Sequence, residues 1–346
     1  MRAKTDYIIQ VMKIKRIILF ILALAFFTTC GGGSNSGEGD PSDPDINRND
    51  HAAKITQSIP KSSQNPCFSP DGNYIVYTRF LSGYNMGPSE LVKMRIDGSH
   101  EEIIVPAVGF DNVNVPYGSW VGHKICFSSD RGGGADEIWI VNDDGTNLRK
   151  ITIHAKDDGV YYIEPVFNPK NSNQIVFEYV NGEDDATAIH KIAFLDVVTG
   201  DVTLLTNGIF DDRLPSWDND GERILFQRNE YGRDEGWSAY IADINSTNPS
   251  IHHIRLVSAG SGDYTDCSWS YNSKYILCSS LFGDNLDVPN IWMFPLDSSL
   301  VPLQKTFNHT YEDGAPSQSH DGKYIAFESH YGDSEEEPSE IWIIDE

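Results

Sequence analysis

A short pattern that recurs about every 50 residues constrains the fold of this chain more than any other feature. It begins at a proline or cysteine and ends at an aromatic residue or cysteine, and successive copies start 50, 49, 50, 52 and 49 residues apart. The copies run over residues 66–77, 116–127, 165–177, 215–226, 267–278 and 316–327. A fixed period of this size indicates a repeat architecture in which each repeat is one small structural unit.

Each copy predicts two short strands joined by a tight turn. In the first copy, the polar residue Ser69 starts the turn, and Asp71-Gly72 continues it, because glycine tolerates the positive φ that such turns need. Ile75 follows, and isoleucine stands at this place in all six copies; Tyr77, or its equivalent aromatic or cysteine, comes two residues later. This spacing places one apolar stripe on one face of a strand.

Two further apolar runs follow each hairpin, which gives four short antiparallel strands per period and matches a propeller blade. The sequence contains six such starts but only five fourth strands, because it stops at Glu346. The missing strand is expected at the other end, since residues 53–56 (AKIT) resemble residues 149–152 (RKIT), which form a fourth strand. We therefore predict an all-β, six-bladed β-propeller of four-stranded antiparallel blades over residues 52–346, closed by the N-terminal strand.

The N-terminal region is predicted to be an export signal with an anchor, followed by a tether. Basic residues precede an apolar run over residues 17–27, which is short of the roughly 20 residues of a transmembrane helix and fits a secretory signal. Cys30 ends residues 1–30 and precedes three glycines, which resembles the lipobox of bacterial lipoproteins and implies lipid attachment there. The alternative is ordinary signal cleavage beside an incidental cysteine.

Composition indicates a disordered segment and limits the kinds of partner that the chain can bind. Residues 31–51 are acidic and rich in Gly, Ser and Pro, so they are expected to form a disordered tether. The formal net charge of −25 repels nucleic acid and favours cationic partners, and we expect no nucleic-acid partner. We expect a monomer attached to the membrane through its lipid anchor, without a cofactor.

Two cysteines mark the fifth copy as different. Cys267 and Cys278 replace the first residue and the last aromatic residue of the pattern. If the polar residue of the turn closes the hairpin, counting back by alternation places Pro66 of the first copy opposite Tyr77 at a non-hydrogen-bonded pair. The equivalent cysteines then have Cα atoms about 4.5 Å apart, within reach of a disulfide. We predict a Cys267–Cys278 disulfide in this exported protein, with two buried thiols as the alternative.

The full blade pattern resembles the TolB-type β-propeller repeat. It combines P-x-F/W-S-P-D-G-x-x-I-x-F with S-S-D-x-G-G at residues 128–133, then I-W-x-x-x-x-D-G and L-x-x-I-T. The resemblance covers residues 52–346 and implies a six-bladed propeller in the bacterial cell envelope whose N-terminal strand closes the ring. Related blades occur in oligogalacturonate lyases and in prolyl-oligopeptidase-type peptidases.

The sequence carries no motif of known catalytic chemistry. It contains no G-x-S-x-G elbow, no H-E-x-x-H motif and no H-x-H element like that of the lyase relatives. Cys67 and Cys126 occupy equivalent sheet faces of different blades and are expected to be unpaired core residues. We expect no catalytic residue and no metal site, and keep a metal-dependent lyase as the alternative.

The links between blades carry a repeated signature of an aromatic residue followed by an acid. They emerge on the same face as the links between second and third strands, so the signature is expected to ring the mouth of the channel. The candidate residues are Phe110, Asp111, Tyr162, Phe210, Asp212, Arg213, Tyr264, Asp266, Tyr311 and Asp313. Such a mouth suits a cation, a basic peptide or a sugar; alternatively, the acids accept backbone N–H bonds and the aromatics pack between blades.

Longer loops on the same face add residues that we expect to be exposed for recognition. They are Tyr84, Tyr231, Arg233, Trp237, Phe282 and Tyr331. We predict a non-catalytic, exported, lipid-anchored protein of the bacterial envelope (outer membrane, facing periplasm or surface) whose propeller binds a protein or glycan partner through this face. The alternative is a carbohydrate-active enzyme, similar to oligogalacturonate lyase, on the same propeller.

Overall fold

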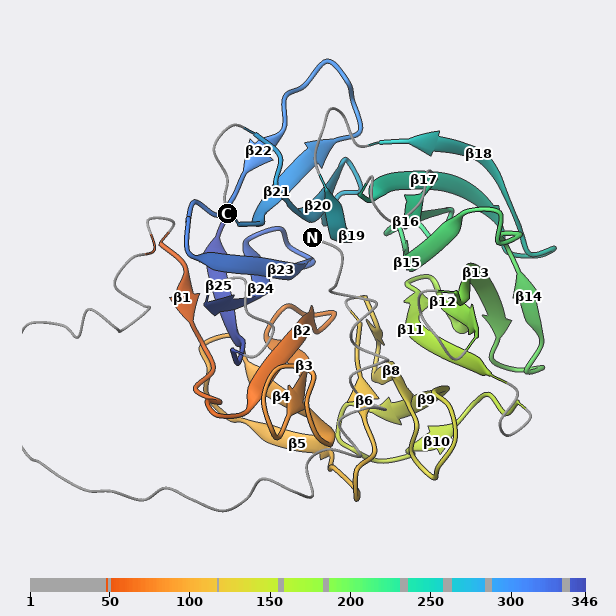
Figure 1. Cartoon of the computed structure of the whole chain (residues 1–346), viewed down its shortest axis with the longest axis horizontal. Coiled ribbons are helices and arrows are strands. Elements are labelled where there is room, and N and C mark those ends of the chain that lie inside the picture. The colour runs from red at the N-terminus through yellow and green to blue at the C-terminus, as the bar shows by residue number, and fades with distance from the viewer. Residues whose placement is uncertain are drawn as a thin grey trace, which may run out of the picture.

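Six antiparallel sheets surround a central axis, which confirms the predicted six-bladed, all-β propeller (Figure 1). The structure is a computed structural model. It describes Arg48 and residues 51–346, apart from residues 117, 155–158, 183–186, 231–235, 258–262, 284–287 and 332–336. The predicted export signal, the anchor Cys30 and nearly all of the predicted tether therefore lie outside the described residues.

Each blade is a meander whose first strand lies nearest the axis (Figure 1). Blade 1 contains β2 (Ser62–Phe68), β3 (Tyr74–Phe80), β4 (Ser89–Arg95) and β5 (Glu102–Val105). Blade 2 contains β6 (Val113–Asn114), β7 (Trp120–Val121), β8 (Lys124–Ser129), β9 (Glu137–Asn142) and β10 (Arg149–Lys150). Blade 3 contains β11 (Val160–Asn168), β12 (Asn171–Asn181), β13 (Ile189–Asp196) and β14 (Val202–Leu204).

The other three blades repeat this plan. Blade 4 contains β15 (Asp211–Trp217), β16 (Arg223–Asn229), β17 (Ser238–Asn245) and β18 (Ser250–Leu256). Blade 5 contains β19 (Tyr264–Trp269), β20 (Tyr275–Ser280), β21 (Asn290–Pro295) and β22 (Leu303–Gln304). Blade 6 contains β23 (Tyr311–Gln318), β24 (Tyr324–Tyr331), β25 (Glu340–Asp345) and β1 (Ala53–Lys54). In blade 2 the inner strand is split, and both pieces, β6 and β7, pair with β8.

The N-terminal strand closes the ring as predicted. β1 pairs antiparallel with β25, with Ala53 opposite Ile343 and Lys54 opposite Trp342. Thr56 follows β1, and its hydroxyl oxygen accepts the backbone N–H of Ile341 at 2.8 Å. In blade 2, the Thr152 hydroxyl oxygen accepts the backbone N–H of Ile138 at 2.9 Å. The threonine of the shared K-I-T sequence therefore makes the same hydrogen bond in both blades.

The recurring turn has the predicted closure. The backbone N–H of Ser69 donates to the carbonyl of Tyr74 at 2.8 Å, and the Ser69 hydroxyl oxygen accepts the Tyr74 N–H at 3.0 Å. Gly72 adopts a φ of 71°, and Ser273, which replaces the glycine in blade 5, adopts 53°. The Ser-Pro-Asp-Gly sequence therefore forms the tight turn between the first two strands of the blade.

The hydrophobic core lies between neighbouring blades. The recurring isoleucine is fully buried in all six copies: Ile75, Ile125, Ile175, Ile224, Ile276 and Ile325. Each packs in a cluster shared by two adjacent blades; the cluster of Ile75 and Tyr77, for example, includes Ala326 and Ile341 of blade 6. Cys67 and Cys126 are buried free cysteines, as predicted.

Candidate functional site

The structure places half of the predicted ring residues inside the fold rather than at a ligand-accessible mouth. Asp212, Arg213, Tyr264, Tyr311 and Asp313 are each no more than 3% exposed. They belong to β15, β19 and β23, where inner strands pack against the neighbouring blade. The expectation that these five side chains face a ligand is therefore corrected.

The two acids at equivalent positions, Asp212 and Asp313, each hold an arginine. The Asp212 carboxylate accepts Arg228 Nε at 2.6 Å and Nη2 at 3.1 Å. The Asp313 carboxylate accepts two guanidinium bonds from Arg48 at 2.9 Å each. Arg213 is likewise paired, with Asp211 at 2.8 and 2.9 Å. These carboxylates stabilise the blades. The sequence predicts backbone N–H groups as the alternative partners of such acids, and the structure adds guanidinium groups.

The remaining signature residues are spread over the ring. Phe110 is 78% exposed and Asp111 is half-buried. Phe210 is half-buried under the guanidinium of Arg228, and Tyr162 stacks edge-on against Phe177. Of the ten predicted residues, Asp266 alone joins the channel cluster described next.

The loop residues that the structure describes are also less exposed than predicted. Tyr84 donates to Glu328 at 3.1 Å, the Trp237 ring lies 5.1 Å from the Arg213 guanidinium, and Phe282 packs edge-on against Trp292. Tyr231, Arg233 and the side chain of Tyr331 lie outside the described residues.

A bulge in five of the inner strands shapes the channel. Just before the first residue of the copy, one non-glycine residue adopts a left-handed φ between 46° and 55°: Asn65, Glu164, Leu214, Asp266 and Ala315. At each of these places the pairing register shifts, so that two residues oppose one on the second strand. The bulge turns the residue's N–H away from its own ladder and toward the neighbouring blade.

At three of the five bulges, a polar side chain of the preceding blade accepts a hydrogen bond from that N–H group. The donor and acceptor pairs are Asn65 N to Glu328 Oε2 at 2.8 Å, Leu214 N to Glu178 Oε2 at 3.1 Å, and Asp266 N to Gln227 Oε1 at 2.9 Å. In blade 2, Val115 N donates to Thr78 Oγ1 at 3.0 Å in the same way. Each acceptor directly follows the copy's last aromatic residue, and these four hydrogen bonds join neighbouring blades at their inner strands.

These acceptors were missed at the sequence level, although a signal was present. The position after the aromatic or cysteine is polar in every copy: Thr78, Ser128, Glu178, Gln227, Ser279 and Glu328. A polar residue that recurs inside a strand of a buried blade must have a partner, because an unpaired buried polar group is costly. This recurring polar position therefore predicts hydrogen bonds between the second strand of each blade and a neighbouring element.

Amides and carboxylates converge inside the ring to form what we call the channel cluster: Asn65, Asn114, Glu164, Asp266 and Glu328. Asn65 Nδ2 donates to Asn114 Oδ1 at 2.8 Å, and Asn114 Nδ2 donates to Glu164 Oε1 at 2.8 Å. A Cβ atom added at Gly314 would stand 3.6 Å from Asp266 Oδ2 and 3.6 Å from Glu328 Cγ. Residues of blades 1, 2, 3, 5 and 6 thus meet at one place.

Two carboxyl groups of the channel cluster, those of Glu164 and Glu328, have raised pKa values. Burial, together with the negative charges of Glu178 and Asp266, raises the pKa of Glu164 to about 8. Burial raises the pKa of Glu328 to about 7, with Asp266 adding to the rise and the Asn65 N–H opposing it. Burial, with a smaller contribution from neighbouring charges, therefore favours the protonated, neutral form of both glutamates near neutral pH.

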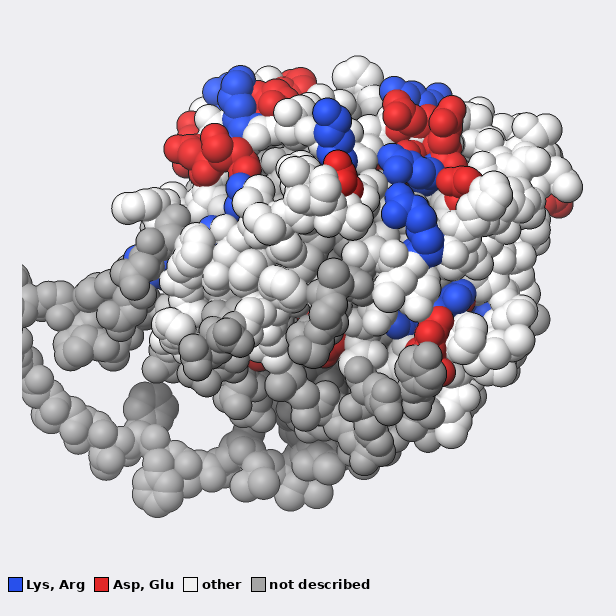
Figure 2. Space-filling view, turned by 90° about the horizontal axis from the view of Figure 1, so that it is seen from above, with Lys and Arg blue, Asp and Glu red and all other residues white. Residues whose placement is uncertain are grey.

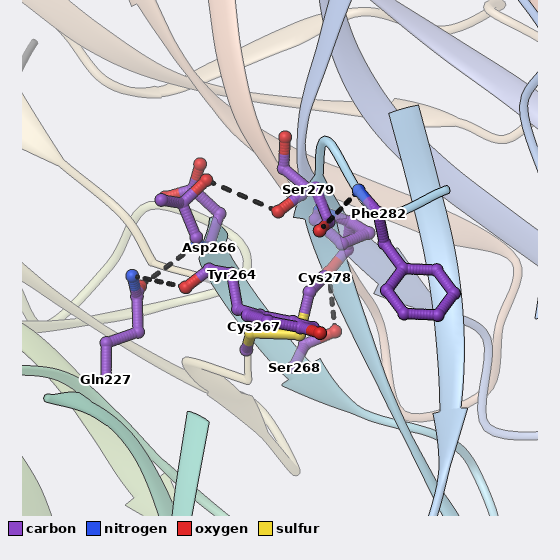
Figure 3. The surroundings of a disulfide bond; sticks show 11 residues. Gln227, Tyr264, Asp266, Cys267, Ser268, Cys278, Ser279 and Phe282 are labelled. Carbon is purple, nitrogen blue, oxygen red and sulfur yellow. Dashed lines mark hydrogen bonds between the residues drawn. A yellow bond between two sulfur atoms is a disulfide. The ribbon is translucent and has the colours of Figure 1, made fainter. Parts of the chain in front are cut away.

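Cys267 and Cys278 form a disulfide beside this cluster, with Cα atoms 4.2 Å apart. Asp266 and Cys267 make up the bulge opposite Cys278, so the crosslink fixes the strand where it presents Asp266. Figure 3 shows Gln227 reaching from β16 to this bulge, where its amide also donates to the carbonyl of Tyr264 at 3.0 Å.

The face of the molecule seen from above the view of Figure 1 carries acidic and basic side chains side by side (Figure 2). Within the described ranges, no group of three or more His, Cys, Asp or Glu side chains is arranged to hold a metal ion. The part of the chain that the structure describes contains no helix of the length and apolarity needed to cross a bilayer.

Comparison with solved structures places the chain among propellers of several activities. It is similar to a putative TolB from Agrobacterium tumefaciens (TM-score 0.57, 17% identity, covering 84% of this chain and 92% of that one). It is also similar to an oligogalacturonate lyase in complex with manganese (0.55, 13%, 85% and 78%). At these identities the likeness shows the fold alone.

TolB from Acinetobacter baumannii is similar too, with a TM-score of 0.54 and 15% identity over 83% of this chain. The chain spans 63% of the length of that protein. No curated relative matches the chain significantly. The family described as TolB beta propeller domain matches residues 47–273, about two thirds of the chain, and the chain belongs to this family.

Proposed function

We propose that this chain is a non-catalytic, exported and lipid-anchored envelope protein whose propeller binds a protein partner by taking up a basic side chain in the channel cluster. The observation that carries the proposal is the convergence of Glu164, Asp266 and Glu328 on one place, where burial and the charge of Asp266 raise the pKa of the two glutamates. A cation that enters favours the ionised carboxylates, so its uptake is coupled to release of the protons that the two glutamates hold.

The amides of the channel cluster support the same role. Asn65 and Asn114 hold the Glu164 carboxylate through a chain of hydrogen bonds. The disulfide and the Gln227 side chain fix the bulge that carries Asp266. A rigid set of acceptors suits recognition of an ammonium or guanidinium group, because little ordering is needed on binding.

The test is titration of the purified protein with trilysine, a probe that offers primary amines and no sugar. We expect saturable binding that weakens at least about tenfold in the triple variant Glu164→Gln, Asp266→Asn and Glu328→Gln. The matched control, Asp97→Asn, Asp144→Asn and Asp297→Asn, neutralises the same number of carboxyl groups at exposed hairpin turns on the other face, and should bind as the wild type does. Equal weakening in both variants would show non-specific charge attraction and contradict the proposal.

The enzymatic alternative has its own readout. Incubation with oligogalacturonate and manganese should release no unsaturated product. Product that forms with the wild type and disappears with a chelator would overturn the non-catalytic assignment, whatever the outcome with trilysine.

A further inference from the structure

Arg48, outside the ring in sequence, is buried within it. Its side chain is 2% exposed and that of Asp313 is 0% exposed. Nη1 and Nη2 each donate to the Asp313 carboxylate at 2.9 Å, and Nη1 also donates to Ser329 Oγ at 2.8 Å. This planar, two-point contact is the geometry by which carboxylates recognise guanidinium groups.

Three aromatic rings surround the same guanidinium. Its central carbon lies 4.7 Å from the ring centre of Trp342, 5.1 Å from Phe327 and 5.4 Å from Tyr311. Aromatic faces attract cations, most strongly where water is excluded. Asp313, Ser329 and these rings together form what we call the blade 6 cage.

Blade 4 contains the same cage with a different arginine. Asp212 occupies the position of Asp313, and Phe210, Phe226 and Tyr240 occupy those of the three rings. The guanidinium of Arg228 lies 4.7 Å from Phe210 and 5.2 Å from each of the other two rings. The cage therefore occurs in blades 4 and 6, and its arginine comes from the second strand in one and from outside the ring in the other.

The residue equivalent to Arg228 explains why blade 6 takes an arginine from elsewhere. Arg228 stands opposite Asp212 in the β15–β16 ladder, and Ser329 stands opposite Asp313 in the β23–β24 ladder. Serine is too short to fill the cage, so the space is left for the side chain of Arg48. Ser329 instead donates to Asp313 at 2.6 Å and accepts from Arg48.

We propose that the blade 6 cage is a binding site for an arginine side chain, that Arg48 is its ligand in this chain, and that a guanidinium supplied from solution can take its place. Occupied by Arg48, the site adds a second fastening to the ring closure made by β1. It also holds Arg48, which lies within the predicted tether, against blade 6. This inference does not depend on the channel cluster or on the proposed function.

The experiment is thermal unfolding of Arg48→Ala with and without millimolar methylguanidinium. Removing Arg48 leaves the buried Asp313 carboxylate without its cation, so the melting temperature should fall by about 5–10 °C. Methylguanidinium should restore most of the loss, methylammonium of equal charge should restore little, and the wild type should respond to neither. An unchanged melting temperature, or equal rescue by both cations, would overturn the proposal.

A second variant tests the cage without an additive. Arg48→Ala combined with Ser329→Arg places an arginine where blade 4 has Arg228, and should melt near the wild-type temperature and no longer respond to methylguanidinium. A double variant that stays as unstable as Arg48→Ala, or still responds to methylguanidinium, would show that blade 6 lacks the arginine site of blade 4.

Discussion

Two carboxyl groups in the channel contribute to the way in which the stability of the fold changes with pH. Glu164 has a pKa of about 8 and Glu328 a pKa of about 7 in the folded chain, against about 4.3 for a glutamate in an unfolded chain. The folded state therefore binds more protons than the unfolded state over this window. The stability that these protons contribute is complete below about pH 4 and is lost as pH rises through about 7 to 8.

Replacing one of these acids by its neutral isostere should remove part of this dependence. We expect Glu164→Gln to be as stable as the wild type near pH 4 and more stable near pH 9, because each pKa unit corresponds to roughly 1.4 kcal/mol. Urea unfolding at several pH values measures this. Asp144→Asn, at an exposed turn, is the control; parallel pH profiles for Glu164→Gln and the wild type would refute the raised pKa.

Residue-level roles were only partly predictable from sequence. The aromatic-then-acid signature identified Asp212 and Asp313 as distinctive, but their partners Arg228 and Arg48 come from an adjacent strand and from the predicted tether. Nothing in the spacing of a link says whether its side chains turn outward or into a blade. Asp266 joins the channel cluster because of a left-handed bulge, which its own sequence does not announce.

At the scale of elements, the hairpin and its bulge explain the position of the disulfide. The alternation argument placed Cys267 opposite Cys278, although it omitted the bulge, in which Asp266 shares that place. The bulge does not change the predicted pairing of the cysteines, since both of its residues stand opposite Cys278 in the ladder. The turn letters, which are local, predicted the closing hydrogen bond correctly.

Loss of the crosslink should loosen blade 5. The double variant Cys267→Ser and Cys278→Ser opens a loop with a sequence separation of 11, and chain entropy predicts a loss of about 2–3 kcal/mol. Urea unfolding measures the loss, and intact mass before and after reduction checks the bond itself. Wild-type protein whose mass does not change on reduction would contradict the disulfide.

Ring closure by β1 can be tested with one hydroxyl group. Thr56→Val removes the acceptor of the Ile341 N–H and should cost about 1–2 kcal/mol. Thr152→Val removes the equivalent acceptor within blade 2, which is continuous in sequence, and serves as the matched variant. A loss with Thr152→Val but none with Thr56→Val would show that the terminal strand is not docked.

At the scale of the whole molecule, the period alone was sufficient for the architecture. Six copies with one buried isoleucine each, and a fourth strand displaced to the start of the chain, leave a closed ring as the arrangement without free sheet edges. The channel cluster could not be predicted in this way, because its residues come from five blades. Their proximity depends on how the inner strands of these blades are placed around the axis of the ring.

The proposed anchor makes a prediction about the whole protein in the cell. Cys30→Ala should move the protein from the membrane fraction to the soluble envelope fraction, because a lipid chain is then no longer attached. Immunoblots of fractionated cells measure this, with Cys67→Ser as the control that keeps Cys30. Membrane association that survives Cys30→Ala would contradict lipidation.

The most direct test of the proposed channel role is the affinity for trilysine as a function of pH. A cation binds the ionised carboxylates, so uptake must release the protons held by Glu164 and Glu328. Calorimetry should therefore show affinity rising from about pH 6 to about pH 9, with proton release near neutral pH. Affinity that is constant over this range, or that falls as pH rises, would contradict binding of a basic side chain in the channel.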